Sequence, residues 1–121
     1  MHPKTPKWLE DIVDRSTFIL DRTANRTLAD YEADERLHSA IERNVGIVGE
    51  ALGRIERIDP ETAARFIDVR TMISLRRHLI HEYDMTDHAL VWGIIREVLP
   101  AVKTDAEALL GKAGIPEDDT D

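Results

Sequence analysis

An arginine lies in the middle of the apolar stripe of one predicted helix. In the stretch Ser74–Tyr83, which reads SLRRHLIHEY, helical spacing places apolar residues within about 60° of Arg76. These neighbours are Val69, Met72, Ile73, Leu79, Ile80 and Tyr83. A guanidinium keeps its charge, and burying it unpaired costs about 3–5 kcal/mol. Arg76 therefore requires an acidic partner, a subunit boundary or an anionic ligand, unless it forms a purely structural ion pair or extends its head group to water.

His81 lies about 140° around the same helix from Arg76. On a straight helix of one chain, the two side chains do not face the same point. They can converge if the helix loosens near its end, or if a second copy of the helix brings its own pair. This geometry suggests a homodimer.

Helical periodicity runs through most of the chain, and no alternating β pattern of convincing length appears. We expect a disordered lead-in over residues 1–6, one helical domain over 7–113 and a disordered acidic tail over 114–121. Longer helices are predicted over residues 7–25, 35–57, 69–83 and 88–112, with short helical segments over 27–31 and 60–66. The predicted fold class is all-α, an up-and-down bundle of four to five helices.

Local signals fix several helix ends. Thr27 and Asp30 have the spacing of a capping box, and Asp34 and Asp87 are predicted N-caps of the helices that follow them. Pro100 falls inside the last helix and should kink or split it.

Three glycines interrupt the helix predicted over residues 35–57. Gly46, Gly49 and Gly53 each cost about 1 kcal/mol relative to alanine in a helix interior. Their spacing suggests the close approach of another backbone, from a neighbouring helix or from a second subunit.

Charge and composition restrict the class of protein. The 121 residues carry a net charge of −8 and no cysteine, which argues against a sequence-blind nucleic-acid coat and against a disulfide framework. Residues 65–81 nevertheless hold four arginines and a single acid. A selective anion site fits this pattern, although a solvated helix face would also produce it. No apolar run suggests a membrane span or a signal peptide, so a cytoplasmic protein is expected.

A metal site is not favoured by the sequence, and no cofactor is expected. The residues that begin at His81 read HEYDM, which departs from the HExxH pattern of zinc helices at its last position. His78 and His88 are predicted on exposed helix surface, and His38 on a helix flank.

Metal-independent cleavage of RNA fits the residues better. Cleavage through the 2′-hydroxyl requires a base, an acid and positive charge near the phosphorus. Histidine can act as base or acid near neutral pH, and the planar fork of arginine suits developing phosphate charge. One chain supplies one such pair, Arg76 and His81, whereas two chains about a two-fold axis supply two.

The pattern Arg76-x4-His81-x-Tyr83 resembles the motif of the HepT toxins, small helical ribonucleases of the HEPN superfamily. The likeness extends to three further segments, which are Trp8–Ile12, Arg43–Ala51 and Asp87–Leu99. The resemblance implies a HEPN-like homodimer that cleaves RNA, with His81 as acid/base and Arg76 as phosphate binder. It also implies a type VII-like HEPN/MNT toxin–antitoxin pair. In such a pair, an MNT-type nucleotidyltransferase antitoxin attaches AMP to Tyr83 and so blocks the RNA cleft.

One position departs from this family pattern. The residue after the motif arginine is usually small and polar, most often Asn, and here it is Arg77. Arg77 could add a phosphate contact or weaken catalysis, and the second outcome favours an alternative: an inactive helical module that binds a nucleotidyltransferase or a nucleotide. Glu50 is a further candidate, because it could neutralise Arg76 or orient His81, or merely pair with Arg54 one turn away.

Overall fold

The computed structural model describes residues 1–81 and 85–114. These ranges contain helices and turns but no strand, which confirms the predicted all-α class. The helices are α1 (Thr5–Thr23), α2 (Leu28–Ala33), α3 (Glu35–Ile58), α4 (Pro60–Ala63), α5 (Arg70–His81), α6 (His88–Glu97) and α7 (Leu99–Gly114). None of them, over the ranges described, has the length and apolar character that crossing a bilayer requires. Of the acidic tail predicted over residues 114–121, all but Gly114 lies outside the described residues.

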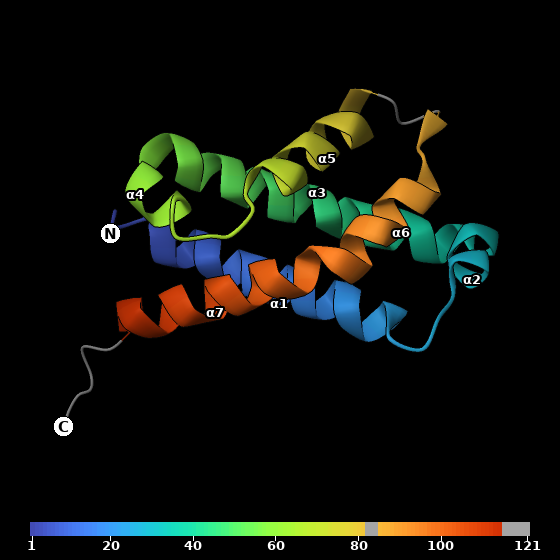
Figure 1. Cartoon of the computed structure of the whole chain (residues 1–121), viewed down its shortest axis with the longest axis horizontal. Helices are drawn as coiled ribbons and strands as arrows, with labels where there is room; N and C mark the ends of the chain where they lie inside the picture. Colours follow the sequence, from blue (N-terminus) through green and yellow to red (C-terminus); the bar gives the residue numbers. More distant parts are fainter. Residues whose placement is uncertain (82–84, 115–121) are drawn as a thin grey trace.

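Helix α3 is the central element of the bundle (Figure 1). Helices α1 and α5 both pack along it, and α7 packs on α1. The short α2 lies against α3 and α6 at one end. The core is built from fully buried side chains of these helices, among them Leu9, Ile12, Ile19, Ile41, Val45, Val48, Leu52, Ile55, Met72, Ile95 and Leu99.

The predicted helix starts are present in the structure. The hydroxyl of Thr27 accepts a hydrogen bond from the backbone N–H of Asp30, whose carboxylate accepts one from the N–H of Thr27, so the capping box is complete. The carboxylates of Asp34 and Asp87 each accept a bond from a backbone N–H of the helix that follows. Each cap satisfies a donor that the helix itself cannot satisfy.

The last helix divides in two near Pro100, as predicted. Helix α6 ends at Glu97 and α7 begins at Leu99. Proline has no backbone N–H, so it cannot donate to the carbonyl four residues earlier.

The N-terminal residues, which the sequence predicts to be a disordered lead-in, contact Asp59. Helix α1 begins at Thr5. The buried carboxylate of Asp59 accepts hydrogen bonds from the backbone N–H of His2 at 2.9 Å and from the hydroxyls of Thr5 and Thr62, both at 2.8 Å. It also caps α4. One acid therefore joins the start of α1 to the end of α3, a contact between residues far apart in the sequence.

Asp59→Ala should lower the free energy of unfolding by about 2 kcal/mol, because it removes a helix cap and leaves buried donors unpaired. Burial would raise the pKa of Asp59, but the hydrogen bonds from His2, Thr5 and Thr62 outweigh it and hold the pKa well below its ordinary 3.8. The stabilisation is thus present above about pH 4 and is lost as the pH falls below that value. Urea unfolding of parent and variant at pH 7 and pH 3 measures both effects, and an equal difference at the two pH values would contradict this account.

Candidate functional site

A cleft of about 640 Å³ opens between α3 and the C-terminal half of α5. It is lined by Ser39, Glu42, Arg43, Gly46, Ile47 and Glu50 from α3, by Arg76, Leu79 and Ile80 from α5, and by Thr86. Apolar side chains and ionisable groups of both signs therefore share one surface. This cleft holds the motif arginine and is the candidate site.

The guanidinium of Arg76 is anchored by Glu50 in the wall of the cleft. Arg76 Nη2 lies 2.5 Å from Glu50 Oε1, and Arg54 Nε lies 2.9 Å from Glu50 Oε2. Two of the three contacts considered for Glu50, those with Arg76 and Arg54, are thus made, whereas no contact with His81 is observed between these two described residues. The hydrogen bond from Arg54 and the charge of Arg76 hold the pKa of Glu50 below its ordinary value, against partial burial. Glu50 therefore stays ionised and fixes the direction of Arg76.

Arg76 lies at the edge of the core face of α5, not in its middle as the sequence pattern suggested. Met72 and Leu75 are buried and form that face, whereas Ile80 is 50% exposed and the side chain of Arg76 is 38% exposed. Among the described elements, α5 packs mainly on α3, and Arg76, Leu79 and Ile80 on another side of its apolar stripe line the cleft.

The close approach of α5 to α3 takes place at Gly49. A Cβ atom on Gly49 would lie 2.6 Å from the Cβ of Arg76 and 2.8 Å from the carbonyl oxygen of Met72. Equivalent atoms on Gly46 and Gly53 would meet nothing within 4 Å among the described residues. The predicted backbone approach is thus observed at Gly49, and the other two glycines leave open surface.

Gly49→Ala should lower the free energy of unfolding by about 1–3 kcal/mol, the usual cost of overpacking a closely packed contact. The added methyl group must push α5 away from α3 and so displace Arg76. Gly93→Ala is the matched control, since no atom of the part of the chain that the structure describes lies within 4 Å of its Cβ position inside α6, and it should stabilise the protein by up to about 1 kcal/mol. Thermal unfolding of the two variants measures these changes in stability, which should have opposite signs. A neutral or stabilising Gly49→Ala would show that the two helices separate easily.

A second hollow, here called the arginine groove, lies next to the cleft. The ion pair of Glu50 and Arg76 lines both hollows. The arginine groove has a volume of about 330 Å³. Its lining residues are Gly49, Glu50, Gly53, Arg54, Glu56, Arg57, Arg70, Ile73, Arg76 and Arg77. Five arginines against two glutamates give it a positive charge. Arg77, the departure from the family pattern, therefore faces a basic groove that suits a phosphate chain.

His81 lies apart from the cleft. It is the last residue of α5, its side chain is exposed, and it is not among the residues that line the cleft. Because α5 remains helical through His81, the angular separation from Arg76 expected from the sequence persists. Tyr83, the predicted AMP acceptor, lies outside the described residues.

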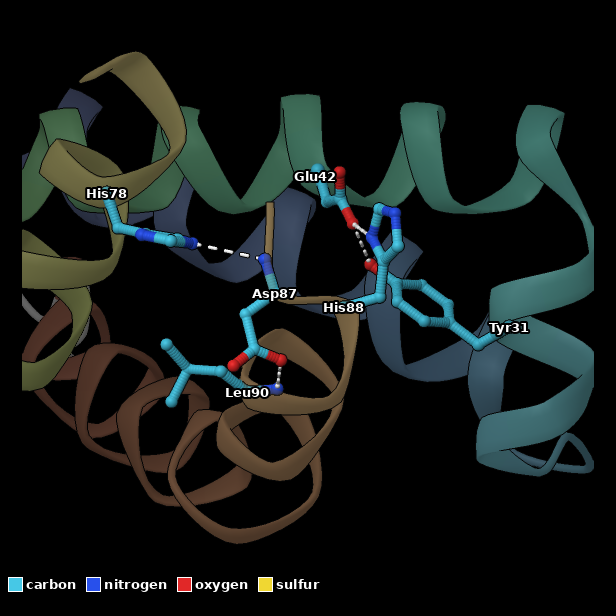
Figure 2. A network of polar contacts seen from close by, with 6 residues as sticks. All are labelled: Tyr31, Glu42, His78, Asp87, His88 and Leu90. Atoms are coloured by element: carbon cyan, nitrogen blue, oxygen red, sulfur yellow. Dashed lines mark hydrogen bonds and ion pairs between the residues drawn. The ribbon is translucent and has the colours of Figure 1, made fainter. Parts of the chain in front are cut away.

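A polar network that the sequence did not reveal borders the cleft (Figure 2). Glu42 Oε2 accepts a hydrogen bond from the hydroxyl of Tyr31 at 2.8 Å and lies 2.7 Å from Nδ1 of His88. His88 is thus partly buried and paired, which corrects its predicted place on exposed helix surface. Nearby, Nε2 of His78 accepts a bond from the backbone N–H of Asp87 at 3.3 Å and joins the end of α5 to the start of α6.

The sequence matches one known family over most of its length. The model of that family, described as ribonuclease HepT-like, matches residues 12–109. The chain belongs to the HepT-like ribonuclease family. This HepT-like protein is therefore a ribonuclease.

Three relatives cover nearly the same length. "Putative RNase TTE0752" of Caldanaerobacter subterraneus is 26% identical over 110 residues, which are 90% of this chain and 97% of that protein. "Probable ribonuclease HepT" of Thermococcus cleftensis is 31% identical over 106 residues, covering 84% and 92% of the two chains. "Putative RNase MJ1380" of Methanocaldococcus jannaschii is 28% identical over 102 residues, covering 83% and 91%. No solved structure matches the HepT-like chain significantly.

Proposed function

We propose that this HepT-like ribonuclease cleaves RNA without a metal ion, in a cleft that a second copy of the chain completes. The observation that carries the proposal is the separation of the motif residues. Arg76 lines the cleft, whereas His81 sits exposed at the end of α5 and outside that lining. A second copy placed about a two-fold axis could bring its own His81 to the Arg76 of the first.

In this proposal, the two copies of His81 divide the proton transfers. One imidazole takes the proton of the 2′-hydroxyl, whose oxygen attacks the phosphorus. The imidazolium of the other copy gives a proton to the 5′-oxygen as its bond to phosphorus breaks. The products are a 2′,3′-cyclic phosphate and a free 5′-hydroxyl. Arg76, oriented by Glu50, stabilises the charge that develops on the phosphoryl oxygens.

The surface around the cleft supports an association of two copies. Ile80 is half exposed beside the cleft. Gly46 and Gly53, which line the cleft and the arginine groove, offer places where a second backbone can approach closely. Arg77 and the other arginines of the groove would then guide the RNA backbone toward the shared cleft.

The proposal includes a toxin–antitoxin pair in the cytoplasm. A nucleotidyltransferase antitoxin of the MNT type would attach AMP to the hydroxyl of Tyr83, two residues after His81 in the sequence. The added phosphate would repel the RNA backbone, and the added bulk would occlude the cleft. Mass spectrometry after co-expression with such an enzyme should show an AMP adduct on the parent chain and none on Tyr83→Phe.

The test is cleavage of RNA by purified, unmodified protein in the presence of a chelator. We expect cleavage products that end in a cyclic phosphate, and sedimentation should show a dimer. A requirement for added divalent metal would contradict the metal-independent mechanism. Full activity in a species that sediments as a monomer would contradict the shared cleft.

A further inference from the structure

Three metal-ligating side chains meet where α6 begins against α3. His38 and Glu42 lie one turn apart on α3, and His88 is the first residue of α6. One ligand atom of each lies within 4.8 Å of those of the other two. The ring centroids of His38 and His88 are 4.1 Å apart. All three side chains are only partly buried, so an ion can reach them from solvent.

We infer that His38, Glu42 and His88 form a binding site for a divalent transition-metal ion, with Zn²⁺ as the best-fitting ion. Two imidazole nitrogens and one carboxylate oxygen are a ligand set that Zn²⁺ uses, with a fourth position left for water. Imidazole ligands favour zinc and its neighbours over Mg²⁺ and Ca²⁺, which prefer oxygen. The inference goes beyond the proposed cleavage of RNA, which uses other residues.

The carboxylate of the site is already held in place by its surroundings. The hydroxyl of Tyr31 donates to Glu42 Oε2 (Figure 2), and Tyr31 is fully buried. Burial and the charge of Glu42 raise the pKa of Tyr31, so its hydroxyl remains a donor. Outer partners of this kind orient metal ligands and strengthen binding.

The hydrogen-bond network beside the cleft does not include His38. Glu42, His88 and Tyr31 satisfy one another, whereas His38 makes ring contacts but no hydrogen bond within residues 1–81 and 85–112. Its ring nitrogens are therefore available as ligands, beside a carboxylate and a second imidazole. A bound ion would use all three side chains and would tie the start of α6 to α3.

The test is a titration of the full chain, freed of metal by a chelator, with Zn²⁺ by calorimetry and with Co²⁺ by absorption. We expect one ion per chain, a Co²⁺ spectrum typical of tetrahedral coordination, and a melting temperature that rises with Zn²⁺. His38→Ala is the decisive variant, because the side chain of His38 makes no hydrogen bond among the described residues. It should weaken Zn²⁺ binding more than the roughly 10- to 100-fold expected for Tyr31→Phe, which removes only an outer partner.

His81→Ala is the matched control, since it removes an exposed histidine outside the site, and it should bind Zn²⁺ like the parent. Circular dichroism checks that each variant keeps its helices. No binding at millimolar Zn²⁺, or binding that His38→Ala leaves unchanged, would overturn the inference. Cleavage of RNA in chelator is measured separately, so failure of the metal site and failure of the proposed ribonuclease mechanism are distinguishable.

Discussion

His81→Ala should cleave RNA about 10²–10⁴-fold more slowly than the parent protein, the usual loss when a general acid or base is removed. The side chain is exposed at the end of α5, so its loss should change the free energy of unfolding by no more than about 0.5 kcal/mol. The effect should therefore appear in the rate of cleavage and not in the fold. Initial rates on a fluorescent RNA, with thermal unfolding of the same samples, measure both.

His78→Ala is the control for this variant, because it removes an imidazole from the same helix that lies outside the motif. It should keep the rate of the parent within a small factor. Equal rates for His81→Ala and the parent would place the acid and base on other residues, and the network of Glu42 and His88 beside the cleft would be examined next.

Arg76→Ala should slow cleavage about 10²–10³-fold, the loss typical of removing one group that stabilises transition-state charge. Arg76→Lys should recover only part of the rate, because an ammonium cannot reproduce the two parallel hydrogen bonds of a guanidinium. The dependence of rate on RNA concentration separates an effect on cleavage from an effect on binding.

Arg54→Ala is the matched control for Arg76. Both arginines bind Glu50, but Arg54 does not line the cleft. It should therefore leave the maximal rate nearly unchanged and affect chiefly the affinity for RNA through the arginine groove. If Arg54→Ala slowed the maximal rate as much as Arg76→Ala, the effect would belong to the charge balance around Glu50 and not to a phosphate contact by Arg76.

Local rules predicted much of the fold. The caps at Thr27, Asp34 and Asp87 and the division near Pro100 each depend on hydrogen bonds between residues close in sequence, and such bonds can be anticipated from residue type and spacing. The place of Arg76 could not be anticipated in the same way. Which part of an apolar stripe is buried depends on how many neighbouring helices pack against it. Among the described elements, α5 packs mainly on α3.

Only part of the candidate site could be predicted from the sequence, because its other contacts join residues that no local pattern relates. The contact between Arg76 and Glu50 was one of the alternatives open from the sequence, because an arginine within an apolar stripe requires an acidic partner and Glu50 carries the opposite charge. The contact of His88 with Glu42 joins residues 46 positions apart, and no periodicity relates them. The one available signal was the spacing of His38 and Glu42, which places two ligands on one helix face.

The most direct test of the shared cleft is to mix the parent with His81→Ala in equal amounts, after subunit exchange, and to measure the rate of RNA cleavage. If each cleft needs His81 from both copies, only dimers of two parent chains are active. Random pairing then leaves about one quarter of the rate of the same total amount of parent. A rate of about one half would show that each His81 contributes independently of the other, and would contradict the two-histidine cleft.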